Sequence, residues 1–127
     1  MTIEWLESYK IGNAEIDAAQ KALFELANQI AESEDWMALR PMIIALYKQM
    51  QILFDLEEAL MTKVAYTGAQ AHAQDHQNLL ARLRDRSMDV GKGHMNKKAI
   101  VGVMTDWAHR HVANQDAELA QYLAVWA

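Results

Sequence analysis

The chain has 127 residues, a formal net charge of −5, one proline and no cysteine. This length suits one domain with a real core and is too short for two, so we expect a single domain over residues 1–127. The lack of cysteine excludes disulfides and thiolate metal sites, and an acidic balance without a basic cluster argues against nucleic acid as a partner. No stretch reaches the roughly 18 apolar residues of a membrane span, and no signal peptide is visible, so we expect a cytoplasmic protein without membrane contact.

Four helical segments follow one another along the chain, each with apolar residues at spacings of three and four. The first is predicted over residues 13–34. The second is predicted to begin near Leu39, with Pro41 in its first turn, and to end around Thr67, before Gly68. The third is predicted over residues 69–88, and the fourth from Asn96 to Tyr122 or beyond. Between them, the segment 89–94 contains two glycines and no periodicity, which predicts a loop.

Short connections between long amphipathic helices predict an all-α fold, an antiparallel up-down four-helix bundle. The dozen residues before the first helix include Trp5 and Tyr9. We expect them to form an extended arm packed on the bundle.

Histidines and carboxylates interrupt the inward stripes of three of these helices, the second, third and fourth. The first stripe runs Ile16, Gln20, Leu23, Ala27, Ile30; the second runs Leu46, Met50, Leu53, Glu57, Leu60, Val64; the third runs Ala69, His72, His76, Leu79, Leu83; the fourth runs Ile100, Met104, Trp107, His111 and continues through Asp116, Leu119, Leu123. A buried carboxylate costs free energy unless a cation, a proton or hydrogen bonds offset it. Glu57, Asp116 and the three inward histidines therefore predict a metal site.

Two spacings set the geometry of such a site. His72 and His76 are four residues apart, so their rings leave one helix about 40° apart around its axis and can reach one ion. His111 and Asp116 are five residues apart, about 140° in a regular helix, so both point inward only if the helix carries a wide turn between them. Such π-turns concentrate at functional sites.

Nitrogen and oxygen donors without sulfur suit iron, manganese, zinc or nickel. Three histidines with two carboxylates favour a redox-active iron or manganese centre, with zinc as an alternative. The competing interpretation is a set of polar residues that hydrogen bonds satisfy inside a helical bundle. For a single histidine we would prefer that interpretation. Five such residues, all at inward-facing positions of their helices, favour a metal site instead.

Several short motifs extend over nearly the whole chain. They are Trp5 with Tyr9-Lys10-Ile11-Gly12-Asn13 and Glu15-Ile16-Asp17, then Phe54-x-x-Glu57-Glu58-x-Leu60-Met61, then Tyr66, then His72-x-x-x-His76, and finally Trp107-x-x-x-His111-Val112-x-x-x-Asp116. In these motifs the chain resembles bacterial hemerythrins, four-helix proteins that bind O2 at a non-haem diiron site. The resemblance implies that His72, His76 and His111 hold one iron, and that Glu57 and Asp116 bridge it to a second.

The chain departs from the family at two positions, both of which are histidines of the second iron in the family. Gln20 stands in place of the first-helix histidine, and Leu53, directly before Phe54, stands in place of the second-helix histidine. Leucine cannot ligate, and glutamine ligates weakly through its amide oxygen. The Gln20 amide is expected either to donate to a free oxygen of Glu57 or Asp116, or to bond the backbone.

We therefore predict a single-metal centre with one iron per chain, manganese and zinc being alternatives. One iron supplies one electron, whereas the family's O2 carriage draws one from each of two. The predicted function is thus binding or sensing of a small diatomic or reactive oxygen species, namely O2, NO, superoxide or peroxide. Two alternatives stay open: a diiron O2-binding protein with a weak second site, and a superoxide- or peroxide-reactive mononuclear iron enzyme. A binding protein is preferred over an enzyme, and a monomer is expected.

Four apolar residues are predicted to line the pocket beside the metal. They are Trp107, which is four residues before His111, together with Phe24, Met50 and Met61. The methionines are flexible enough to line a small cavity. His109 is only two residues from His111, so we expect it to face away from the site.

Overall fold

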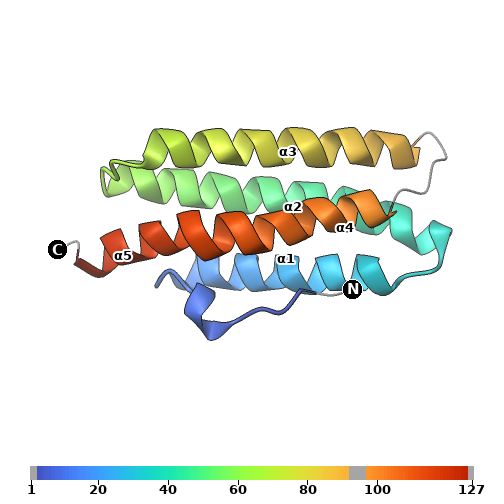
Figure 1. The fold of residues 1–127 in the computed structure, drawn as a ribbon, viewed down its shortest axis with the longest axis horizontal. Coiled ribbons are helices and arrows are strands. Elements are labelled where there is room, and N and C mark those ends of the chain that lie inside the picture. The colour runs from blue at the N-terminus through green and yellow to red at the C-terminus, as the bar shows by residue number, and fades with distance from the viewer. Residues whose placement is uncertain (1–2, 92–96, 126–127) are drawn as a thin grey trace.

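The computed structural model describes residues 3–91 and 97–125. Its elements are a 3-10 turn at Glu7–Tyr9, α1 (Ala14–Glu32), α2 (Trp36–Lys63), α3 (Ala69–Gly91), α4 (Lys97–Asp106), a π-helix (Trp107–Asp116) and α5 (Ala117–Val125). Figure 1 shows that α4, the π-helix and α5 form one continuous rod, which is the predicted fourth helix. The described residues contain no strand, and the predicted all-α four-helix bundle is confirmed.

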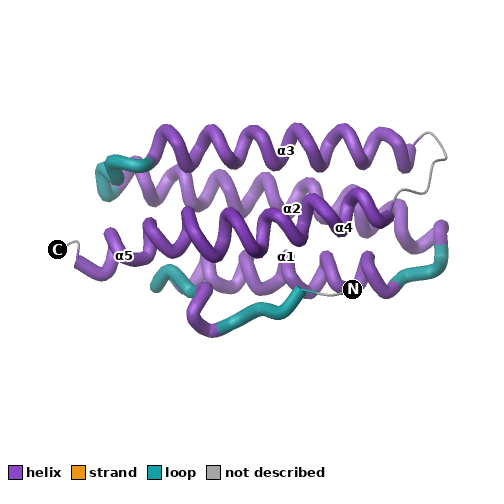
Figure 2. Tube along the Cα trace, viewed as in Figure 1, coloured by secondary structure: helices purple, strands orange, loops and turns teal. Residues whose placement is uncertain are grey.

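Figure 2 shows the helices running alongside one another, and their buried apolar residues form one core. Helices α1 and α3 each contact both α2 and α4, which closes the bundle. The stripe residues predicted to face inward are buried, apart from a few at the helix ends that are partly buried. No helix among the described residues is both long enough and apolar enough to cross a membrane.

Two polar side chains fix where the first two helices begin. The Asn13 side chain accepts a hydrogen bond from the Ile16 N–H at 3.0 Å, and the Asp35 side chain accepts one from the Met37 N–H at 3.0 Å. Helix α2 therefore begins at Trp36, one turn earlier than predicted.

Pro41 consequently lies inside α2, and its predicted place in the first turn was wrong. A proline removes the hydrogen bond that its N–H would give to the carbonyl four residues earlier, here that of Met37. Both residues are exposed, so water can satisfy this carbonyl and the helix tolerates the proline.

The connection between α2 and α3 begins earlier than the sequence suggested, since α2 ends at Lys63. Ala65 adopts the left-handed backbone conformation, with φ 53°. A Cβ at residue 68 would lie 2.9 Å from the ring of Tyr66, so any larger residue in place of Gly68 would force this ring to shift. Of the loop predicted over 89–94, residues 89–91 continue α3, and the remainder, like Asn96, lies outside the described residues.

The predicted N-terminal arm runs along α1 and is tied to it by side-chain amides. Asn28 accepts from the Ile3 N–H and donates to the Ile3 carbonyl, both at 2.8 Å. Deeper along α1, the Trp5 indole N–H donates to Gln20 Oε1 at 3.0 Å, and Gln20 Nε2 donates to the Tyr9 carbonyl at 3.4 Å. The fully buried Gln20 amide therefore serves as the attachment point of the arm.

This attachment predicts the effect of Trp5→Phe. The substitution leaves Gln20 Oε1 buried without its donor, so the free energy of unfolding should fall by about 1–3 kcal/mol. Urea denaturation of Trp5→Phe, Gln20→Leu and the double variant measures this effect. The loss in the double variant should be smaller than the sum of the two single losses, because both partners of the hydrogen bond are then removed. Simple additivity would contradict the contact.

Candidate metal centre

Five buried side chains from three sides of the bundle converge on one point. Glu57 comes from α2, His72 and His76 from α3, and His111 and Asp116 from the π-helix. Each is at most 2% exposed, and one donor atom from each lies within 4.8 Å of the other four. The structure thus brings together all five residues that the sequence singled out.

The separations between these donor atoms fall in a narrow range. Glu57 Oε1 lies 3.1 Å from the Nε2 atoms of His72 and His76, and 3.8 Å from that of His111. Asp116 Oδ1 lies 3.0 Å from His72 Nε2 and 3.1 Å from His111 Nε2. Ligands held about 2.1 Å from a metal stand about 3 Å from their neighbours and about 4 Å from the ligand opposite, if the angles are near 90° and 180°. The cluster has the spacing of a coordination shell.

The π-helix is what allows His111 and Asp116 to face the same point. In a π-helix the hydrogen bonds run from residue i to i+5, so residues five apart fall on one side. The segment Trp107–Asp116 adopts this form without proline or glycine. The wide turn predicted from the spacing is confirmed, and it extends over ten residues.

Two of the histidines are held from behind by carboxylates. His76 Nδ1 lies 2.9 Å from Glu58 Oε2, and His111 Nδ1 lies 2.6 Å from Asp75 Oδ2. An ionised carboxylate only accepts hydrogen bonds, so each Nδ1 carries the proton. In the neutral ring each Nε2 then turns its lone pair toward the centre of the cluster. Glu58 and Asp75 are thus positioning residues.

Several donor atoms in the cluster face one another without a proton to share. His76 Nε2 and His111 Nε2 are 3.1 Å apart, yet the Nδ1 anchors leave both as acceptors when the rings are neutral. Among the described residues, Glu57 Oε2 and Asp116 Oδ2 are buried without a hydrogen-bond partner, and Asp116 Oδ1 meets only the Nε2 atoms of His72 and His111. Such an arrangement is unfavourable unless a cation or additional protons occupy the middle. The donor set therefore fits a divalent metal ion.

Without a metal, protons must supply the positive charge. Burial by itself lowers the pKa of His111, but contacts with Asp116, Asp75 and Glu57 outweigh it and raise the pKa to about 11. Burial raises the pKa of Glu57, yet the contacts with His111, His72 and His76 bring it well below its usual value. Burial and the charge of Glu57 raise the pKa of Asp116. In the metal-free cluster the surrounding carboxylates thus stabilise the His111 imidazolium.

The two positions that differ from the hemerythrin pattern offer no nitrogen donor. Leu53 is fully buried, and its side chain is hydrocarbon. The Gln20 amide bonds Trp5 and the Tyr9 carbonyl, so it bonds the arm rather than Glu57 or Asp116. Of the two roles expected for Gln20, the backbone-bonded one is observed.

The residues predicted to line a pocket are buried in the core. Phe24, Met50, Met61 and Trp107 are at most 1% exposed, and the rings of Phe24 and Trp107 lie 5.0 Å apart. Their role as a ligand pocket stays a prediction. His109 is exposed, as expected.

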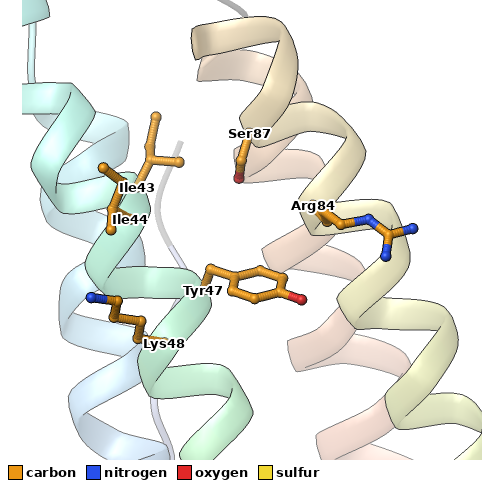
Figure 3. A pocket seen from close by; sticks show the side chains of 6 residues that line it. All are labelled: Ile43, Ile44, Tyr47, Lys48, Arg84 and Ser87. Atoms are coloured by element: carbon orange, nitrogen blue, oxygen red, sulfur yellow. The ribbon is translucent and has the colours of Figure 1, made fainter.

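Two surface recesses differ in their relation to the five clustered residues. Figure 3 shows an apolar groove of about 300 Å³ between α2 and α3, which includes Ile44, Tyr47 and Arg84 and none of the five clustered residues. A second recess of about 270 Å³ lies at the α2–α3 connection, and His72 is one of the residues that line it.

Sequence reasoning missed three contacts around the cluster. Glu58 and Asp75 are one residue away from Glu57 and His76 in the chain, and they were not assigned as anchors. Phe54 stacks on the His76 ring, with centroids 3.8 Å apart and planes within 3°. A carboxylate on the adjoining face of the neighbouring helix is the signal that could have found both anchors.

Comparisons with known proteins agree with this architecture. No family model matches the chain. A bacteriohemerythrin from Ralstonia nicotianae is 26% identical over 125 residues, covering 96% of this chain and 89% of the relative. A crystal structure of a hemerythrin mutant superposes with a TM-score of 0.82 at 21% identity, covering 95% of this chain and 97% of the other.

The raised pKa of His111 predicts how the stability of the metal-free protein changes with pH. The unfolded histidine has a pKa of about 6.5, so the stabilisation by the imidazolium is complete below that value and is lost as pH rises toward about 11. In EDTA, the free energy of unfolding should fall between pH 7 and 9, by at most about 1.4 kcal/mol per pH unit. His111→Gln should show a flatter profile. Parallel profiles for parent and variant would contradict the assignment.

Proposed function

We propose that this chain, which is hemerythrin-like in sequence and fold, holds one iron ion and uses it to bind or sense a small diatomic or reactive oxygen species. The observation that carries the proposal is the buried five-donor cluster, in which lone pairs and unpaired carboxylate oxygens converge on one point. Three imidazoles and two carboxylates are donors that iron accepts, and manganese and zinc accept them too. The likeness to a bacteriohemerythrin favours iron among these metals.

Charge balance supports a divalent ion. Glu57 and Asp116 together carry two negative charges, and neutral imidazoles add none. One divalent metal therefore makes the cluster neutral, which is the state that a buried site favours. Bound iron would supply redox chemistry with O2-derived species, while five protein donors leave one position of an octahedron for a small ligand.

The surroundings of the cluster favour one metal rather than two. The hemerythrin resemblance puts the ligands of a second iron at residues 20 and 53. Leu53 has no donor atom, and both ends of the Gln20 amide are engaged by the arm. A second ion would have only the outer oxygens of Glu57 and Asp116 and water.

A single metal limits the chemistry. One Fe(II) supplies one electron, so the two-electron O2 storage of a diiron pair is not open to it. NO and superoxide, which react in one-electron steps, match such a centre better, as does peroxide reacting with Fe(II). Turnover of superoxide or peroxide would make the protein an enzyme, and rapid catalytic decay after superoxide pulses distinguishes this alternative from simple binding.

One observation favours the alternative of a diiron site. Glu57 Oε2 and Asp116 Oδ2 are buried without a hydrogen-bond partner, and two such oxygens can serve a second cation. Metal stoichiometry separates the two proposals.

The first test is the metal content of freshly purified protein, measured by mass spectrometry. About one iron per chain is expected. His76→Ala and His111→Ala should lose tight binding and melt at lower temperature, because Glu57 and Asp116 then stay buried without a metal. His109→Ala is the matched control, since it removes an exposed histidine from the same helix and should keep the metal. Full metal content in His111→Ala, or two irons in the parent, would refute this assignment.

The second test rebuilds the missing positions. Gln20→His combined with Leu53→His should raise the capacity for Fe(II), added anaerobically, from about one to about two per chain. The metal-free double variant should be less stable than the parent, because it loses the hydrogen bonds to Trp5 and Tyr9 and buries a polar ring at residue 53. Iron titration and urea denaturation measure both effects. A capacity that remains at one would show that these two positions do not face a second metal.

A further inference from the structure

The three histidines of the cluster are not held equally. His76 and His111 are each fixed at Nδ1 by a carboxylate, at 2.9 Å and 2.6 Å, and His76 is also stacked on Phe54. His72 has neither support, because its Nδ1 is buried and has no hydrogen-bond partner among residues 3–91 and 97–125. Its ring meets His76 and His111 only edge-on, with centroids 4.6 Å away in both cases.

The position of His72 in the fold adds to this difference. It lies in the first turn of α3, where its N–H bonds the Gly68 carbonyl at 3.0 Å. Helix ends open at lower free energy than helix interiors, and His76 lies one turn deeper. The segment before it contains the left-handed Ala65. The backbone thus resists motion of His72 less than motion of His76.

Space is available next to His72. The recess of about 270 Å³ is lined by Tyr66, Gly68, Ala71, His72, Gln115 and Glu118. Gly68 and Ala71 are small, and neither can block the ring. Although His72 is only 2% exposed, it thus borders a recess that opens to solvent.

We propose that His72 is the exchangeable ligand of the centre: it leaves the metal toward this recess, while His76 and His111 stay in place under Glu58 and Asp75. This inference rests on the proposed metal site. It assigns different roles to three histidines that the sequence presents as equivalent. A carboxylate behind a ligating histidine holds the ring and makes it a better donor, and its removal weakens metal binding about 10–100-fold.

Co(II) serves as the probe, because its visible absorption reports the donor set and its release to EDTA can be timed. His72→Ala should keep a stoichiometric but weaker Co(II) site, whereas His76→Ala and His111→Ala should not bind Co(II) stoichiometrically. Free imidazole should restore the parent spectrum in His72→Ala, because the recess admits it.

The converse experiment supplies the missing anchor. Gln115 and Glu118 border the same recess as His72, and Gln115→Glu adds a second carboxylate to it. If this carboxylate bonds His72 Nδ1, Co(II) release should slow about 10-fold. Gln29→Glu adds the same charge at an exposed position of α1 and should leave the release rate unchanged. Glu58→Gln and Asp75→Asn should accelerate it. A shift of the His72 ring ¹⁵N resonances in Zn(II)-loaded Gln115→Glu would show that the carboxylate acts on this ring.

The outcomes separate the two proposals. If the parent protein binds no metal, the proposed function fails. If the parent protein binds one metal but the three alanine variants lose it equally, the function stands and the exchangeable role of His72 is overturned. The same holds if Gln115→Glu shifts the His72 ring resonances but releases Co(II) at the parent rate.

Discussion

Five donor atoms held within 4.8 Å of one another in a buried core constrain the rest of this bundle. Their lone pairs and charges oppose one another unless protons or a cation intervene. The helices therefore cannot pack in an arbitrary register, because each must bring its polar residue to one point. The wide turn at Trp107–Asp116 follows from this requirement, since only a π-helix aligns residues five apart. Hydrophobic packing holds the bundle together, and the cluster selects its register.

Leu53 and Gln20, the two residues that differ from the hemerythrin pattern, both stabilise the bundle. Leu53 adds hydrocarbon to a core that is buried throughout, and Gln20 anchors the N-terminal arm through Trp5 and Tyr9. A histidine at residue 20 that bound a metal through one nitrogen would keep only an N–H donor, so it could not also accept from the Trp5 indole. Attachment of the arm at residue 20 and ligation by residue 20 are thus alternatives. In this chain residue 20 therefore serves to attach the arm.

The sequence predicted the fold and the cluster because both depend on periodicity. The sequence alone reveals a polar residue within an apolar stripe, and it also reveals a five-residue spacing that requires a wide turn. Features set by neighbours from other helices were not visible. The anchoring of His111 by Asp75 depends on how α3 faces the π-helix, and the partner of Gln20 depends on the path of the arm. The prediction of α2 began about one turn too late because it used Pro41 as the mark of the first turn. The residue that caps the helix is Asp35, and Pro41 lies inside it.

Unequal support of equivalent ligands gives a buried centre a way to react without opening the core. A site in which every ligand is clamped binds metal tightly but offers incoming molecules only its free position. Here carboxylates hold His76 and His111, whereas His72 has no such anchor and borders a recess at the start of α3. Exchange at His72 would then occur where motion disturbs the packing least. The carboxylates Glu58 and Asp75 would then hold His76 and His111 on a bound metal during that exchange, so different residues would determine binding strength and ligand access.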